Sequence, residues 1–269
     1  MKTYIVTGAS GGIGEKIIHK LLLGKNIVFA ADIQIEPLDA LKSKFQEFGD
    51  NLIVEILDVR KPELWEKIIQ KAAKQKLPFY GLIHSAGVLL PAFIKDSRWQ
   101  DIDFHIDINT KGSLYGSQIA AKYFSEKRSG HIIHIASLAG ISPVPGIALY
   151  SASKFAVRGF SLALAMELSE FNVHVTCICP DAVNTAMLDL QKDYVEAALT
   201  FSGSKALTAD EVSDAVISVI GKNTMEIILP SSRGLEAKFA SFFPQLASKI
   251  LSVYRNKGLK NQKKFKEQS

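Results

Sequence analysis

The chain has 269 residues, of which 47% are hydrophobic and 22% are charged, a balance that excludes a disordered chain and favours a globular protein with a substantial core. Its net charge of +5 lies entirely in residues 255–269, where six basic residues face Glu267 alone. That segment interleaves only Phe265 as a stacking residue, which argues against nucleic acid as a partner.

Short apolar, β-branched runs alternate with segments of helical length. The runs cover residues 3–6, 27–31, 52–57, 81–84, 131–136, 173–179 and 226–229. This alternation predicts a parallel sheet with helices on both faces, and the nearly continuous apolar run at residues 27–31 is typical of a strand buried on both sides. We therefore predict one α/β domain over residues 1–230, a Rossmann-like doubly wound parallel sheet of about seven strands.

A glycine-rich loop, Thr7 to Gly14, follows the first strand directly and precedes a helical pattern. Gly8, Gly12 and Gly14 permit the tight turn and the close backbone approach by which a helix N-terminus receives a pyrophosphate. The strand, loop, helix and second strand are all in place, so the sequence predicts a dinucleotide site here.

Two acidic residues follow the next strands. Asp32 ends the second strand, where a carboxylate can bind the ribose hydroxyls of a dinucleotide. A 2′-phosphate would lie beside this carboxylate, and positions 10, 11, 33 and 34 supply no cation, so the sequence favours NAD over NADP. Asp58 either hydrogen-bonds adenine, with Val59 packed on the ring, or begins an ordinary turn.

The helical pattern after residue 147 begins with Tyr150 and Lys154 at i, i+4, which places both side chains on one helical face. A free tyrosine has a pKa of about 10, too high for an efficient base at neutral pH. A nearby cation lowers such a pKa by roughly 1 to 3 units. Ser137 ends the fifth predicted strand, from which its hydroxyl can reach a substrate oxygen.

Together with Asn109, these residues make residues 3–230 resemble the short-chain dehydrogenase/reductase family in its compact, single-domain, NAD-dependent form. The resemblance implies that Tyr150 is the general acid/base and that Ser137 orients the carbonyl. It implies that Lys154 binds the nicotinamide ribose and lowers the tyrosine pKa, and that Asn109 holds a water in a proton relay. It also implies that the cofactor contacts Ser10, Ile13, Ala86, Gly87, Tyr150, Lys154, Pro180, Val183 and Thr185.

The sequence departs from the family pattern at two places. His84-Ser85-Ala86-Gly87 stands where the family usually has Asn-Asn-Ala-Gly, so hydrogen bonding on the adenosine side must differ. Pro180-Asp181 stands where Pro-Gly is usual, which bears on the backbone beside the nicotinamide. The resemblance further implies a homodimer or homotetramer built through helices around residues 111–124 and 150–168.

The segments that flank the catalytic residues, 88–91, 138–147 and 187–188, are apolar. This lining suits a lipophilic secondary alcohol or ketone, lipid-like or steroid-like, better than a sugar. The alternative is a non-catalytic NAD-binding redox sensor or scaffold, for which an intact Ser-Tyr-Lys set is not needed. His131 and His134 lie on one strand and face opposite ways, and we predict no metal site.

Residues 231–254 carry apolar residues at intervals of 3 to 4 positions, interrupted at Pro244, and a basic tail predicted to be disordered fills residues 255–269. The amphipathic stretch either docks on the body as a substrate lid or, with the basic tail, lies on an anionic membrane through residues 235–266. The chain shows neither a signal-peptide pattern nor an apolar run of about 18 residues, so we expect it in the cytoplasm.

Overall fold

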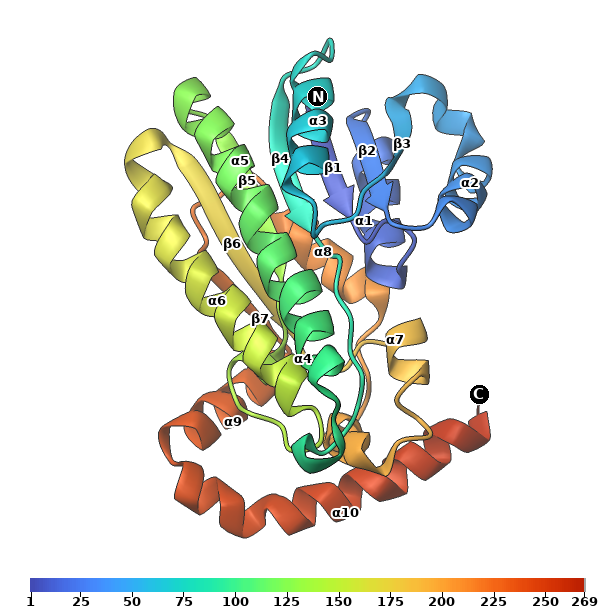
Figure 1. Ribbon diagram of the computed structural model, residues 1–269, viewed down its shortest axis with the longest axis vertical. Helices are drawn as coiled ribbons and strands as arrows, with labels where there is room; N and C mark the ends of the chain where they lie inside the picture. Colours follow the sequence, from blue (N-terminus) through green and yellow to red (C-terminus); the bar gives the residue numbers. More distant parts are fainter. Residues whose placement is uncertain (269) are drawn as a thin grey trace.

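The computed structural model describes residues 1–268 and shows one sheet with helices packed against it (Figure 1). Within these residues seven strands are hydrogen-bonded in the order β3-β2-β1-β4-β5-β6-β7, and every neighbouring pair is parallel. The strands are β1 (Thr3–Thr7), β2 (Ile27–Asp32), β3 (Leu52–Ile56), β4 (Phe79–His84), β5 (Gly130–Ile135), β6 (Val173–Pro180) and β7 (Glu226–Leu229). The predicted doubly wound α/β fold is confirmed.

Helices cover both faces of the sheet (Figure 1). One layer holds α1 (Gly12–Leu23), α2 (Ile35–Lys44) and α8 (Ala209–Val219), and the other holds α3 (Pro62–Ala73), α5 (Gly112–Lys127) and α6 (Ala148–Leu168). Shorter elements are α4 (Trp99–His105), the π-helical turn η3 (Ile106–Lys111), α7 (Ala186–Asp189) and the 3-10 helix η6 (Val195–Ser202). No helix in the described part of the chain has the length and apolar character needed to cross a membrane.

Each layer closes its own hydrophobic core because alternate strand residues point to opposite faces of a sheet. In β1, Tyr4 and Val6 belong to the core that α1 and α8 cover, and Ile5 belongs to the core that α3, α5 and α6 cover. Trp65 of α3 is buried in the second core, where its indole nitrogen donates to the Val59 carbonyl (2.9 Å). These two cores fix the strand register, and with it the positions of the residues at the strand ends.

The carboxyl ends of the strands bring the predicted site residues to one edge of the sheet. The glycine-rich loop follows β1, Asp32 ends β2, Ser137 follows β5 and Pro180 ends β6. The chain reverses its direction of travel across the sheet between β1 and β4, and ligands bind at such a switch point in open α/β sheets.

Two further helices, α9 (Ser231–Phe242) and α10 (Pro244–Gln268), lie across the end of the molecule below the sheet in Figure 1, and we call residues 231–268 the C-terminal extension. The predicted disorder of the tail is wrong for residues 255–268, which continue α10; residue 269 lies outside the described residues. Gly258 lets α10 approach η6, where a Cβ would lie 1.9 Å from the Ala198 carbonyl oxygen. Gln262 is buried, and its Nε2 donates to the carbonyls of Gln191 (2.9 Å) and Tyr194 (2.8 Å).

Candidate active site

The glycine-rich loop makes the sharp turn from β1 into α1 that its sequence predicts. Gly8 has φ +63°, a conformation that favours glycine, and a Cβ at Gly14 would lie 2.1 Å from the Gly8 carbonyl oxygen. A Cβ at Gly12 would lie 2.9 Å from the Thr185 methyl group, so the loop packs directly against the segment after β6. The backbone of this loop is therefore free of side chains where a pyrophosphate would approach the start of α1.

Asp32 faces the glycine-rich loop. Its Oδ2 accepts hydrogen bonds from the Ser10 backbone nitrogen (3.0 Å) and from the Ser10 hydroxyl, and its Oδ1 accepts one from the Ile33 nitrogen (2.8 Å). A carboxylate has about four acceptor sites, so these bonds orient Asp32 and leave it able to accept from a ribose hydroxyl.

Asp58 and Val59 are engaged within the protein. Arg60 donates to both Asp58 oxygens, from Nε at 2.8 Å and from a terminal nitrogen at 2.7 Å, and this hydrogen-bonded guanidinium lowers the pKa of Asp58. Val59 is buried, and its side chain meets Gly112 of α5, where a Cβ would lie 2.7 Å from a Val59 methyl group. The adenine contacts predicted for these residues stay predictions.

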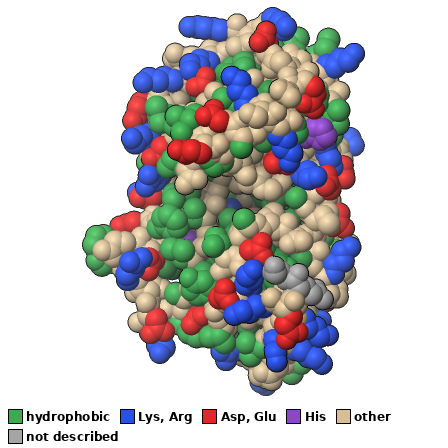
Figure 2. Space-filling model, turned by 90° about the vertical axis from the view of Figure 1, so that its right-hand side faces the viewer, with side chains coloured by type: hydrophobic (Ala, Val, Ile, Leu, Met, Phe, Trp, Pro, Cys, Tyr) green, Lys and Arg blue, Asp and Glu red, His purple; other side chains and the backbone are tan. Residues whose placement is uncertain are grey.

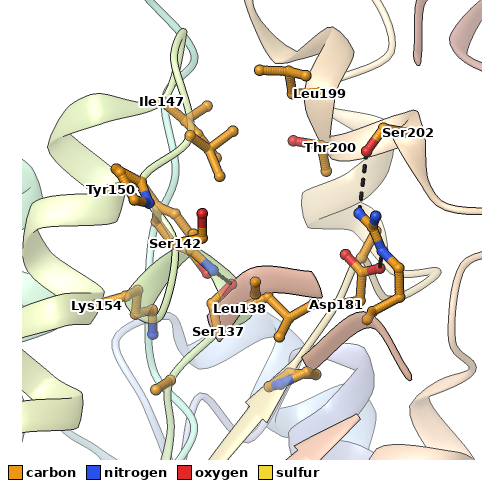
Figure 3. A pocket seen from close by; sticks show the side chains of 18 of the residues that line it. Ser137, Leu138, Ser142, Ile147, Tyr150, Lys154, Asp181, Leu199, Thr200 and Ser202 are labelled. Carbon is orange, nitrogen blue, oxygen red and sulfur yellow. Dashed lines mark hydrogen bonds and ion pairs between the residues drawn. The ribbon is translucent and has the colours of Figure 1, made fainter. Parts of the chain in front are cut away.

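Tyr150, Lys154 and Ser137 come together as predicted (Figure 3). Tyr150 and Lys154 lie on the first turns of α6, and Ser137 lies at the end of β5, where its Oγ accepts from the Ala139 nitrogen (3.1 Å). The Ser137 hydroxyl lies close enough to Tyr150 to act on the pKa of the phenol. The Lys154 ammonium donates to the Ile135 carbonyl (2.9 Å) and lies 5.6 Å from the centre of the Tyr150 ring.

Burial controls the protonation of Tyr150 and Lys154. It raises the pKa of Tyr150 to about 12, although the Ser137 hydroxyl acts in the opposite direction. It also lowers the pKa of Lys154 to about 8, because desolvation disfavours the ammonium. At neutral pH the protein alone therefore holds a protonated tyrosine beside a largely protonated lysine. Lys154 by itself does not bring Tyr150 to a pKa near 7.

Asn109 lies in the π-helical turn η3, is buried, and links three elements. Its Oδ1 accepts from the Val88 nitrogen (2.7 Å), and its Nδ2 donates to the Val88 carbonyl (2.9 Å) and to the Ser153 hydroxyl (2.9 Å). The side chain thus joins the segment after β4 to α6 behind Tyr150. The water that the resemblance assigns to Asn109 stays a prediction.

The first departure from the family pattern fills the end of β4 with a buried imidazole. His84 Nδ1 pairs with the Thr7 hydroxyl (3.1 Å), whose oxygen also accepts from the Ala86 nitrogen (3.2 Å). Burial holds the pKa of His84 well below its usual range, so the ring is neutral. Thr7 and His84 together position Ala86 and Gly87 beside the glycine-rich loop.

The second departure brings in a residue that the sequence did not reveal. Asp181 pairs with Arg233 of α9 (Oδ2 to Nε, 2.9 Å), and Arg233 also donates to the Ser202 hydroxyl (3.1 Å) and to Glu236 (2.8 Å). The Asp181 nitrogen still donates to the Leu229 carbonyl (2.7 Å), so the β6–β7 pairing continues past Pro180. The only signal of this contact was an acidic residue where the family has glycine.

A cavity of about 820 Å³ opens from the trio. Predicted residues on its wall are Ile13, Gly87, Ser137, Tyr150, Lys154, Pro180, Val183 and Thr185. The predicted apolar lining is present in part, through Leu89, Leu138, Val144, Ile147, Met187 and Leu188. The extension supplies a further part of the wall, including Leu235, Phe239, Ala247, Ile250, Leu251 and Tyr254. The other predicted residues are not part of this wall: Gly8, Ser10, Gly12, Gly14, Asp32, Asp58, Val59, Ala86 and Asn109.

A dinucleotide loop at the switch point of a parallel sheet, with a tyrosine and a lysine at the same edge, defines an oxidoreductase that uses a nicotinamide cofactor. The family model described as short chain dehydrogenase matches residues 2–195. The chain belongs to this family.

Relatives support this assignment. The chain is 31% identical over 244 residues to an uncharacterized oxidoreductase of Staphylococcus saprophyticus, a match that covers 87% of this chain and 98% of that one. It is 32% identical over 189 residues to 3beta-hydroxysteroid dehydrogenase 2 of Eggerthella lenta, covering 68% and 72%. Among solved structures, the closed form of serine dehydrogenase complexed with NADP+ is 33% identical, with a TM-score of 0.72 and coverage of 84% and 94%.

Proposed function

We propose that this chain is an NAD-dependent oxidoreductase that transfers a hydride between the nicotinamide and a lipophilic secondary alcohol or ketone, of lipid-like or steroid-like character. One observation carries the proposal: Tyr150 and Ser137 lie on the wall of a mostly apolar cavity, with the Lys154 ammonium beside them. An apolar pocket with a few convergent polar groups is typical of a small-molecule site.

The residues fit a nicotinamide nucleotide. A Cβ at Gly87 would lie 3.3 Å from both the Lys154 ammonium and Asn109 Oδ1, so glycine keeps a small cradle open beside the lysine. An ammonium has three donors, and Lys154 uses one on the Ile135 carbonyl. The others are available to ribose hydroxyls.

The proton chemistry follows from the two hydroxyls. In ketone reduction the Tyr150 hydroxyl gives its proton to the carbonyl oxygen, and in alcohol oxidation the phenolate takes the proton of the substrate hydroxyl. The Ser137 hydroxyl, aimed at the same place, donates to the substrate oxygen and orients it. The nicotinamide, when bound, supplies or accepts the hydride. Since burial raises the pKa of Tyr150 to about 12, the protein alone favours the protonated form that reduction needs, and the cationic nicotinamide of NAD+ lowers this pKa for oxidation.

The preference for NAD rests on Asp32. Its carboxylate is fixed beside Ser10 by two hydrogen bonds, and a 2′-phosphate placed there would face a like charge. Arg60, the first cation after β3, is held on Asp58. The NADP+ bound by the related serine dehydrogenase makes the direct comparison of NAD and NADP essential.

The apolar wall supports a lipophilic substrate, as does the name of the Eggerthella lenta relative, a hydroxysteroid dehydrogenase.

The proposed assembly is a homodimer or homotetramer through α5 and α6. The proposed location is the cytoplasm, with residues 235–266 in peripheral contact with a membrane.

The test is an absorbance screen of lipophilic alcohols and ketones with NAD(H) and with NADP(H), for wild type and Tyr150→Phe. We expect turnover with NAD(H) that the variant loses while it still binds the cofactor, because only the proton donor is removed. Faster turnover with NADP(H) would contradict the cofactor assignment. Cofactor binding without turnover across the panel would contradict the enzyme assignment and favour a redox sensor.

A further inference from the structure

Helix α10 presents two different faces along its length. One face points to the protein: Ala247, Leu251 and Tyr254 line the cavity, and Gly258 and Gln262 contact η6 or the segment before it. These positions recur every three or four residues, as expected for one side of a helix. The protein therefore covers only one side of α10.

The neighbouring face carries a second stripe at the same spacing. Its first half is Leu246, Ile250 and Val253, all exposed, and its second half is Lys257, Lys260 and Lys264, also exposed. None of the three lysines forms an ion pair within residues 1–268. One uninterrupted line of side chains thus passes from apolar to cationic along the helix.

Exposed apolar side chains also lie on α9 and at the bend between α9 and α10. Leu235, Phe239, Phe242 and Phe243 are all exposed, Phe242 by 79% and Leu235 by 72%. Together with the six stripe residues they form what we call the docking surface. Large apolar side chains gathered in this way on an extension mark a contact with another apolar phase or partner.

The charge of α10 selects the partner. The helix holds seven basic residues against Glu267 alone, and Figure 2 shows several Lys and Arg side chains in the lower part of the molecule. An anionic bilayer offers acyl chains to the apolar half and phosphates to the lysines. A second copy of the chain would instead bring two strongly basic helices together, which is unfavourable.

The docking surface also reaches the cavity. Leu235, Phe239 and Ile250 are exposed and at the same time line the cavity wall. We propose that the docking surface binds an anionic membrane and that the lipophilic substrate passes from the bilayer into the cavity between α9 and α10. The second part rests on the proposed function.

The docking itself is tested by flotation of the full-length protein, without cofactor or substrate, on vesicles of phosphatidylcholine alone or mixed equally with phosphatidylglycerol. We expect flotation only with the anionic vesicles. Each basic residue near an anionic surface contributes a similar attractive free energy. The vesicle partition coefficient should therefore fall on the order of a hundredfold in the triple variant Lys257→Gln/Lys260→Gln/Lys264→Gln. Equal flotation on both vesicle types, or none on either, would overturn the proposal.

A matched control removes the same charge elsewhere. Lys67, Lys74 and Lys76 are exposed on and after α3, toward the opposite end of the molecule (Figure 1), and their triple Gln variant should float like wild type. Leu246→Asn/Val253→Asn removes apolar contact outside the cavity wall and should also float poorly. If this variant changed the sedimentation mass while wild type did not float, the surface would cover a second copy and the membrane proposal would fail.

The route of the substrate is tested separately. With a lipophilic ketone carried in anionic vesicles, the Lys257→Gln/Lys260→Gln/Lys264→Gln variant should show a raised KM. Its KM for a water-soluble ketone should stay at the wild-type value. Equal kinetics of the two proteins with the vesicle-borne ketone would overturn the route. Flotation without any redox turnover would leave the docking surface standing and remove the proposed function.

Discussion

The cofactor edge and the C-terminal extension contribute to one cavity, but different interactions hold them in place. The edge is fixed by the parallel strand ladder and by two closed cores, so its loops follow from buried backbone. The extension lies outside the sheet and is held by contacts of α9 and α10 with loops and η6, among them Arg233 on Asp181, Gly258 packed on Ala198, and Gln262 on two carbonyls. The family match ends at residue 195. The catalytic residues thus belong to the sheet scaffold, and part of the wall around the substrate belongs to a segment outside it.

The largest effect should come from the edge itself. Lys154→Met removes the cation beside Tyr150 and the donors proposed for the ribose, so kcat/KM should fall on the order of a thousandfold and cofactor binding should weaken as well. Steady-state kinetics and cofactor titration measure both. Lys67→Met, on the exposed side of α3, is the control and should match wild type. Full activity of Lys154→Met would remove the lysine from the site.

Displacing the extension should leave the chemistry intact. In Gly258→Ala the new methyl group would overlap the Ala198 carbonyl, at a cost of about 1 to 3 kcal/mol to the contact between α10 and η6. We expect faster proteolysis of α10 and a higher KM for a lipophilic substrate, with unchanged NAD affinity.

Gly159→Ala is the matched control for this change, since a Cβ at that helical glycine meets nothing within 4 Å. It should stabilise the protein slightly. If both alanine variants kept wild-type proteolysis and KM, the contact of α10 with η6 would have no role in the cavity.

The joint between the two regions is the Asp181–Arg233 pair, both of whose side chains are largely buried (14% and 23% exposed). Asp181→Ala should lower the free energy of unfolding by about 1.5 to 3 kcal/mol, because it removes charge-assisted hydrogen bonding and leaves Arg233 partly unpaired. Adding Arg233→Ala to this variant should lower the free energy of unfolding only a little further. Urea unfolding of the two single variants and the double variant measures the coupling, and strictly additive losses would show that the pair does not act as a unit.

The last prediction concerns the pH dependence of stability in the core beneath the cofactor edge. His134 is buried between the hydroxyls of Ser117 (2.7 Å) and Ser161 (2.8 Å), and burial lowers its pKa to about 3. Its folded pKa lies below the unfolded value of about 6.5, so its contribution is complete above pH 6.5 and is lost by about 1.4 kcal/mol per pH unit as the pH falls toward 3. Urea midpoints between pH 7 and pH 5 should decline less steeply in His134→Asn than in wild type. Parallel declines would contradict the burial of a neutral imidazole.

The sequence was sufficient for what depends on local pattern. The inner strands β1, β2, β4, β5 and β6 are largely buried, so they appear as apolar runs. The glycine-rich loop and the Tyr150–Lys154 spacing are likewise short-range features. Contacts across the chain were not readable in the same way. The role of Arg233 can be recognised only in the folded structure, where Asp181 lies against it.

Composition also misled where tertiary contacts decide the outcome. Residues 255–268 have the charge of a solvated tail, yet Gly258, Gln262 and Phe265 lie on the protein-facing side of α10, and the rings of Phe265 and Phe201 lie 5.5 Å apart. Helical spacing of three or four residues links these positions, and the lysines between them obscure that pattern. The roles of Asn109, Asp58 and Val59 depend on the bound cofactor and stay predictions.

The division of the cavity wall bears on how such an enzyme can be diversified. The hydroxyls and the ammonium that would handle the proton belong to β5 and α6, while much of the surface that selects a substrate belongs to a segment added after β7. Exchange of residues 231–268 between homologues, with Arg233 retained as the anchor, therefore offers a route to new substrate ranges on an unchanged redox scaffold.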